Sequence, residues 1–145
     1  MITKNCVSVN RCQPLVDTSV WIDLFRQRKT AAVNHIYQIL DNYQYYGITE
    51  LIYQEVIQGA FNQADFDKLA DYLISQTFFY PKNGPQSYKQ AANIYFSCRR
   101  QGITIRSTID CMIAQIAIEN NLVLLHNDKD FEYIAKVFPT LKLWQ

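Results

Sequence analysis

The stretch TIDCMIAQIAIENNLVLLHND, residues 108–128, decides the fold class of this chain. Its first part is mostly apolar and predicts a helix that begins at Ser107 or Thr108, which are good N-cap types, and runs to Asn121. Residues 122–126, LVLLH, form a continuous apolar run, which is typical of a strand buried on both faces of a parallel sheet. A helix that leads into such a strand is one unit of an α/β domain.

The same alternation extends over the rest of the chain. Further strands are expected at residues 14–16, 45–48, 77–80 and 141–144. Further helices are expected from Thr18 or Ser19 to 25, and over 30–43, 49–59, 65–76, 86–101 and 128–136. Because strands alternate with helices, the sequence predicts an α/β domain with a central, mainly parallel sheet flanked by helices.

Length and composition set limits on what the chain is. Its 145 residues suit one domain, expected at 14–145 after a short lead-in at 1–13. No apolar run is long enough to span a membrane, and the N-terminus is too polar for a secretory signal, so a cytoplasmic location is expected. The net charge of +1 gives no global attraction for nucleic acid, although a local basic groove remains open.

The four cysteines, Cys6, Cys12, Cys98 and Cys111, match no zinc-binding spacing. Cys98 and Cys111 fall in apolar helical stretches, where a free cysteine behaves as a small apolar residue. Reduced thiols are therefore expected. A Cys6–Cys12 disulfide is the alternative, with no other feature of the sequence in its favour.

Four acidic residues stand at places from which a fold of this class can aim them into one pocket. Asp17 directly follows the first strand, and Asp128 follows the strand at 122–126. Ligands bind beyond the carboxyl ends of the strands in open parallel sheets, so both acids belong to the same edge. Asp110 lies in the first turn of its helix. Glu55 lies beside the apolar face of the helix at 49–59, where a carboxylate needs a partner.

Carboxylates gathered in one cleft repel each other and raise each other's pKa values. A hard divalent cation such as Mg²⁺ or Mn²⁺ removes that repulsion and can take part in catalysis. Taken singly, each acid also has a simpler explanation. Asp17 is then a cap or loop residue, Asp128 a turn residue, Asp110 a favourable charge in a first turn, and Glu55 an exposed flank residue.

Three segments together resemble one known family. They are LVDTSVWIDLF (15–25), TELIYQEVIQG (49–59) and TIDCMIAQIAIENNLVLLHNDKDFEYIA (108–135), and with them the chain resembles the PIN-domain family and, within it, the VapC-type toxins of toxin–antitoxin pairs. The resemblance runs from Pro14 to Trp144. It implies a PIN-like α/β/α sandwich with Mg²⁺- or Mn²⁺-dependent endoribonuclease activity. It also implies an RNA substrate, a cognate antitoxin that blocks the site, and a homodimer.

The resemblance also assigns roles to residues of this chain. Asp17, Glu55, Asp110 and Asp128 would be the catalytic acids, with Asp17, Asp110 and Asp128 on the metal and Glu55 acting through a water or as a proton acceptor. Supporting roles would fall to residues beside them: Thr18 or Ser19 holding the first acid or the metal-bound water, Asp130 as a secondary ligand or helix cap, and Arg106 as a phosphate contact. His126, where relatives often have a small polar residue, is expected to be a strand-end residue, and Asp23 a solvated one.

Other functions remain as alternatives. A PIN-fold module with weak or no catalysis would bind RNA or protein, and a pure interaction protein would use the ten Tyr and eight Phe residues. A receiver domain would need paired acids near its start and a late lysine. A dehalogenase-like phosphatase would need Asp-x-Asp after the first strand, whereas Asp17 is followed by Thr18-Ser19.

Overall fold

The computed structural model describes residues 13–42 and 46–144, apart from the side chains of Leu40 and Asn42. Its strands are β1 (Pro14–Val16), β2 (Gly47–Thr49), β3 (Thr77–Phe79), β4 (Val123–Leu125) and β5 (Lys142–Leu143). Its helices are α1 (Thr18–Phe25), α2 (Ala31–Asn42), α3 (Glu50–Gln58), α4 (Gln63–Ile74), α5 (Pro85–Arg100), α6 (Thr108–Glu119) and α7 (Lys129–Val137). Residues 1–12 of the predicted lead-in at 1–13, with Cys6 and Cys12, lie outside the described residues.

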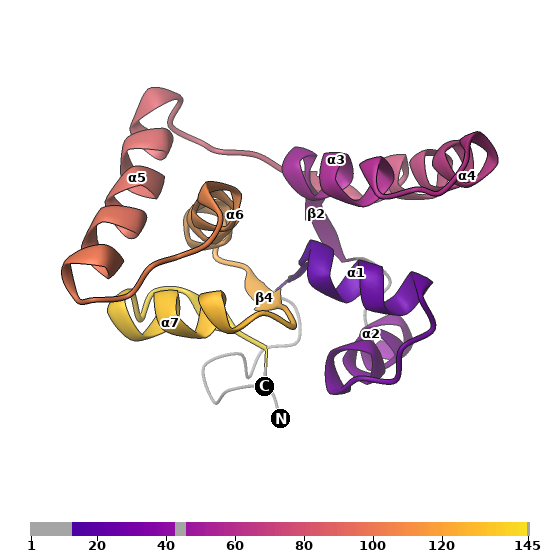
Figure 1. Cartoon of the computed structure of the whole chain (residues 1–145), viewed down its shortest axis with the longest axis horizontal. Helices are drawn as coiled ribbons and strands as arrows, with labels where there is room; N and C mark the ends of the chain where they lie inside the picture. The colour runs from indigo at the N-terminus through magenta and orange to yellow at the C-terminus, as the bar shows by residue number, and fades with distance from the viewer. Residues whose placement is uncertain (1–12, 43–45, 145) are drawn as a thin grey trace.

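The five strands form one sheet in the order β3-β2-β1-β4-β5, and every pairing is parallel. The predicted α/β class and parallel sheet are confirmed. The chain first moves from β1 to β3 and then crosses to β4 and β5 on the other side, so right-handed crossovers place the two helix groups on opposite faces. Figure 1 shows this, with α1 to α4 on one side of the strands and α5 to α7 on the other.

The strand order reverses next to β1, which is the place where ligands bind in such sheets. β1 pairs with β4 so that Val16 lies opposite Leu125, and the backbone N–H of Asp17 donates to the Leu125 carbonyl at 2.9 Å. The ends of these two strands are therefore held in register. The loops that follow them, which carry Asp17 and Asp128, leave the sheet side by side.

The core forms where the sequence predicts it. The apolar residues of β1 and β4 are almost fully buried, and α6 buries every residue from Cys111 to Ala117. Trp21 on α1 is also buried, and its indole N–H donates to the Val16 carbonyl at 3.1 Å. This bond satisfies the one polar group of the ring and fixes α1 against the end of β1.

Several predicted helix starts were displaced because the capping residue is a different one. Asp17, and not Thr18 or Ser19, is the N-cap of α1, and Asn62 starts α4 two residues before the predicted position by accepting from the Asp65 N–H at 2.8 Å. Asp128, and not Asp130, caps α7. A carboxylate or amide oxygen at these positions satisfies free N–H groups of the first turn.

Helix ends and strand lengths also differ slightly from expectation. α6 ends at Glu119 and not at Asn121, because Asn121 takes a positive φ of 52°. Gly102 follows α5 with a φ of 79°, which confirms it as the predicted stop of that helix. β1 has the predicted bounds, whereas the other strands are two or three residues long and shorter than the runs that predicted them, because a residue can be buried without a place in the ladder.

Candidate metal centre

One hollow of about 310 Å³ beyond β1 and β4 contains all four predicted acids. Asp17, Glu55, Asp110 and Asp128 line it from four different elements, together with Thr18, Ser19, Ile22, Arg106, Ser107 and Asp130. The expected convergence of the acids at one edge of the sheet is therefore observed. We call this hollow the acid pocket.

Asp17 is the most deeply placed acid. It is 3% exposed, and its Oδ2 accepts from the Ser19 N–H at 3.0 Å and from the Ser19 hydroxyl at 2.6 Å. Its Oδ1 is buried and has no hydrogen-bond partner among the described residues. Burial raises the pKa of Asp17 to about 6, with a further rise from Glu55, while the bonds from Ser19 act in the opposite direction.

Glu55 reaches the pocket from α3, half-buried, and is held by Thr18. The Thr18 hydroxyl donates to Glu55 Oε2 at 2.7 Å. Thr18 and Ser19 were both suggested as partners of the first acid. In the structure Ser19 binds Asp17, whereas Thr18 binds Glu55. Both bonds fix a carboxylate in one orientation, which is what a preorganised ligand set requires.

Asp110 lies in the first turn of α6, which Ser107 caps by accepting from the Ile109 N–H at 3.2 Å. Burial raises the pKa of Asp110 to about 7, and the negative charges of Asp17 and Asp128 add to the rise. In the protein without a cation, Asp110 therefore holds its proton up to near-neutral pH. The raised pKa of Asp110 indicates that the pocket holds more carboxylates than its own cationic side chains can neutralise.

Asp128, Asp130 and Arg106 form the outer wall of the pocket. The Arg106 guanidinium binds Asp128 Oδ1 through Nη2 at 2.8 Å and Asp130 Oδ2 through Nε at 3.1 Å, and its backbone N–H donates to the same Asp130 oxygen at 3.0 Å. Asp130 is buried. Arg106 thus contacts two carboxylates in this structure, whereas the sequence suggested a phosphate contact, for which its 72% exposed side chain leaves room.

A second layer of bonds joins α1 to the loop between β4 and α7, and sequence reasoning missed part of it. The Asn127 N–H donates to the Ser19 hydroxyl at 3.0 Å, and the Asn127 amide donates to Asp23 Oδ2 at 2.7 Å. Asp23, expected to be solvated, is 5% exposed and also pairs with Arg28. The prediction for Asp23 was wrong because its partner Asn127 is 104 residues away in the sequence.

His126 follows β4, as expected for a strand-end residue. Its Nδ1 accepts from the Asp128 N–H at 3.2 Å, and its ring lies 5.5 Å from that of Phe131. Burial lowers its pKa, so the ring is neutral at physiological pH and keeps the acceptor that this bond needs. His126 therefore helps to orient the backbone that carries Asp128.

The donor set fits a hard divalent cation. Asp110, Asp128 and Asp130 each offer an oxygen, and these three atoms lie within 4.8 Å of one another. The unpartnered Asp17 Oδ1 adds a further ligand atom in the same pocket. Carboxylate oxygens are the ligands that Mg²⁺ and Mn²⁺ prefer. Of the cysteines in the described residues, neither Cys98 nor Cys111 belongs to this group of ligand atoms.

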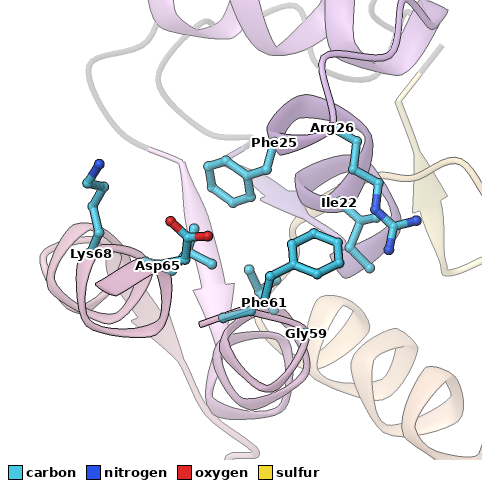
Figure 2. Close-up of a pocket in the computed structure, with 10 residues that line it drawn as sticks. Ile22, Phe25, Arg26, Gly59, Phe61, Asp65 and Lys68 are labelled. Carbon is cyan, nitrogen blue, oxygen red and sulfur yellow. The ribbon is translucent and has the colours of Figure 1, made fainter. Parts of the chain in front are cut away.

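An apolar hollow of about 300 Å³ adjoins the acid pocket between α1, α3 and α4. Figure 2 shows the Phe25 and Phe61 rings across this hollow, with Asp65 and Lys68 of α4 on one side and Arg26 on the other. Phe61 is 86% exposed. Ile22 lines both hollows, so a molecule that fills the apolar one lies next to the acids. We call it the Phe61 hollow.

Comparisons with known proteins agree with this architecture. The family model for the PIN domain matches residues 15–137. VapC ribonuclease Mb1587 of Mycobacterium bovis and ribonuclease VapC11 of Mycobacterium tuberculosis are each 31% identical over 124 residues, which is 85% of this chain and 92% of theirs. None of the helices in the described part of the chain is long and apolar enough to cross a membrane.

Solved structures share the fold. VapBC-1 from nontypeable Haemophilus influenzae superposes with a TM-score of 0.68 at 24% identity, covering 91% of this chain and 96% of that one. The DNA-bound VapBC from Salmonella typhimurium superposes with a TM-score of 0.67 at 19% identity, covering 92% and 97%. From the family match, the VapC relatives and the shared fold, the chain belongs to the PIN domain family, within its VapC group.

Proposed function

We propose that this protein is a metal-dependent endoribonuclease that hydrolyses RNA phosphodiester bonds, and that it is the toxin of a VapBC-type toxin–antitoxin pair. The buried, unpartnered Asp17 Oδ1 inside a pocket of carboxylates carries the proposal. A bare carboxylate oxygen among like charges is costly unless a cation fills the space. The relatives at 31% identity are named ribonucleases, which supports the same reaction.

Asp17, Asp110 and Asp128 are the residues proposed to hold the cation, which we take to be Mg²⁺ or Mn²⁺, with Asp130 as a supporting ligand. A bound divalent ion supplies an activated water and offsets charge on the phosphoryl oxygens. Asp110, with its pKa raised to about 7, gives up its proton when a cation binds. Ser19 keeps Asp17 oriented with one oxygen free for the ion.

Glu55 is proposed to act on the water and not on the metal directly. Its Oε2 is already engaged by the Thr18 hydroxyl, so its Oε1 is the atom aimed at a reacting water as proton acceptor. Arg106 is proposed to turn from its carboxylate partners toward the RNA phosphate. Its guanidinium is mostly exposed, and a bidentate contact with phosphate matches its geometry.

The test is cleavage of a mixed RNA pool by the purified protein, with Mg²⁺ or Mn²⁺ and with EDTA. We expect metal-dependent cleavage that Asp17→Asn abolishes while circular dichroism shows an intact fold. Asp41→Asn, on the exposed surface of α2, is the matched control and should cleave normally. Well-folded protein that binds Mn²⁺ but cuts no RNA would refute the nuclease and favour a PIN-fold binding module.

The proposed antitoxin would bind at the Phe61 hollow. The solved relatives are VapBC structures, and in this chain an exposed apolar hollow lies beside the acids that an inhibitor must block. We therefore propose that an apolar side chain of the antitoxin enters between Phe25 and Phe61, and that its neighbouring residues cover the acid pocket. Charged groups at the rim, Arg26, Asp65 and Lys68, would set its orientation.

The antitoxin proposal is tested by co-expressing the chain with each small protein encoded directly beside its gene. We expect the two proteins to co-purify and RNA cleavage to be blocked. Phe61→Asp should release the partner without loss of cleavage, because the Phe61 side chain is exposed and lies outside the acid pocket. Tight binding by Phe61→Asp would place the antitoxin elsewhere. A homodimer and a cytoplasmic location stay predictions.

A further inference from the structure

A third hollow, of about 530 Å³, opens from the acid pocket on the side away from the Phe61 hollow. Thr104, Arg106, Asn127, Asp128, Lys129, Asp130 and Tyr133 line it. Three of these residues, Arg106, Asp128 and Asp130, also line the acid pocket, so the two hollows adjoin. We call it the Tyr133 hollow. Its volume lies in the usual range of pockets that hold a small-molecule-sized group.

The chemistry of the Tyr133 hollow differs from that of its two neighbours. The acid pocket is lined mainly by carboxylates and the Phe61 hollow mainly by apolar side chains, whereas this one combines two cations and two carboxylates with an aromatic ring. Within the described part of the chain, Lys129 makes no ion pair. With Arg106 paired to Asp128 and Asp130, the positive charges of Arg106 and Lys129 together balance the two carboxylates of this hollow.

Tyr133 is placed to receive a flat ligand. It lies one turn along α7 from Lys129, so both side chains lie on the same side of the helix. The ring is 37% exposed, and the Lys136 ammonium lies 5.8 Å from its centroid. A neighbouring cation of this kind adds positive charge close to a ring on which a nucleobase can stack.

We propose that the Tyr133 hollow holds an unpaired nucleotide of the RNA next to the one whose phosphate is cut. Its base stacks on Tyr133, and its phosphate contacts Lys129 and the outer side of Arg106. This inference rests on the proposed nuclease function and specifies its substrate as a single-stranded segment. A base inside a duplex has no free face for the ring.

The position of α7 supports this path for the strand. α7 begins beside the carboxyl end of β4 and runs away from α1 (Figure 1). RNA that leaves the acid pocket along α7 therefore moves away from the Phe61 hollow between α1, α3 and α4. The surfaces proposed for RNA and for the antitoxin are different and meet only at the acids.

The experiment measures binding of a short fluorescent single-stranded RNA of mixed sequence by fluorescence anisotropy, in EDTA so that no cleavage occurs. We expect Tyr133→Ala to weaken binding about ten-fold, because the variant loses the ring on which one base stacks. Tyr133→Phe should bind like the wild type, since it keeps the ring. Lys129→Ala should reduce, by about one, the magnitude of the slope of the logarithm of the binding constant against the logarithm of the salt concentration. Tyr37→Ala, a 54% exposed tyrosine on α2, is the matched control and should change nothing.

Two further measurements distinguish a failure of the Tyr133 subsite from a failure of the proposed nuclease function. Under cleaving conditions Tyr133→Ala should raise KM and leave kcat nearly unchanged. RNA annealed to a complementary strand should bind weakly and equally to the wild type and to Tyr133→Ala. If wild-type protein binds RNA through Tyr133 but cuts none, the subsite stands and the nuclease falls. If the wild type cuts RNA while Tyr133→Ala binds and cuts normally, or if the wild type fails to bind single-stranded RNA, the subsite is refuted.

Discussion

Asp17 shows how one residue can be a structural cap and still leave an oxygen free for the proposed cation. One of its oxygens is bound by Ser19, while the other is buried without a partner in the described part of the protein. The simpler explanation of Asp17 as a helix cap is therefore correct, and it does not exclude the catalytic one. The cap fixes the carboxylate so that its second oxygen faces the other acids.

The hydroxyl of Ser19 should set the pH at which Asp17 can bind a cation. It donates at 2.6 Å to a carboxylate whose pKa is already raised to about 6, and this bond favours the charged form. In Ser19→Ala the pKa of Asp17 should rise further, so protons compete better with the metal. We expect the acid side of the pH profile for cleavage to move upward by about one pH unit.

The measurement is the rate of RNA cleavage at saturating Mg²⁺ over a range of pH, beside Mn²⁺ affinity from titration. Ser97→Ala is the matched control, because that hydroxyl bonds Asn93 on α5 and neither residue lines the acid pocket. An unchanged profile with weaker activity at every pH would mean that Ser19 acts only by positioning the loop at Asn127.

The sequence predicted Asp17 and Asp128 but not the surroundings of either acid. An Asp that follows a strand is a local sequence pattern. In a parallel sheet such residues lie at the carboxyl edge, so the pattern predicts where the two acids lie. The bond between Asp23 and Asn127 joins residues that no local pattern connects. The roles of Thr18 and Ser19 were left open for the same reason, since the choice depends on where α3 places Glu55.

At the scale of elements, α1 is tied to the loop between β4 and α7 through Asp23. This buried carboxylate accepts from the Asn127 amide at 2.7 Å and from Arg28 at 3.1 Å. Its removal leaves the Asn127 amide without this acceptor, so Asp23→Ala should lower the free energy of unfolding by about 2 kcal/mol. Arg28→Ala should cost less than about 1 kcal/mol, because the Arg28 side chain is 55% exposed.

Urea denaturation followed by circular dichroism checks both values. The loop that Asp23 holds also carries Asp128, so Asp23→Ala should in addition weaken Mn²⁺ binding, whereas Arg28→Ala should not. Equal losses of stability in the two variants would show that the ion pair, and not the bond to Asn127, is what connects α1 to the loop.

Element positions were predicted well because hydrophobic periodicity is a local signal. The run at 122–126 predicted β4, and the spacing of apolar residues predicted α6. Element bounds were predicted less well, because they depend on which side chain caps a helix. Asn62 and Asp128 act as caps, and beside Asp128 the neighbouring Asn127 is also a good capping type.

For the whole molecule, the crowded acids should make the stability of the metal-free protein fall as pH rises. The ordinary pKa of an aspartate is 3.8, and that of Asp110 is raised to about 7 in the folded state. Between these values the folded protein holds a proton that the unfolded chain has lost, so raising the pH favours unfolding. Above about pH 7 Asp110 is charged in the folded protein, and its full destabilising effect is present. Most proteins show the reverse for their carboxylates.

Asp110→Asn removes this cost. In EDTA at pH 8 the free energy of unfolding of the variant should be about 2 kcal/mol higher than that of the wild type. This value allows for the partial exposure of Asp110. At pH 4 the two proteins should be nearly equal. Mg²⁺ should stabilise the wild type at pH 8 and affect the variant less. Thermal melts at both pH values test this, and a variant less stable than the wild type at pH 8 would contradict it.

One apolar face of the molecule is suited to the association of two copies. An apolar hollow of about 320 Å³ lies between α3, α5 and α6, and it includes Ala92, Tyr88 and Ile109. Tyr88 is 63% exposed, which is a large aromatic surface to leave in water. We predict that this face forms the homodimer. A second copy would then pack against the first turn of α6, directly behind Asp110.

Ala92→Glu places a charge in the centre of that face at an exposed position, so the monomer should still fold. Light scattering after gel filtration should show a dimer for the wild type and a monomer for the variant. Asn93→Glu, one residue along the same helix, adds the same charge outside the hollow and should remain a dimer. Because Ile109 and Cys111 of the hollow flank Asp110, loss of the dimer should also loosen α6 and lower RNA cleavage. A wild type that is monomeric at high concentration, or a dimeric Ala92→Glu, would contradict this interface.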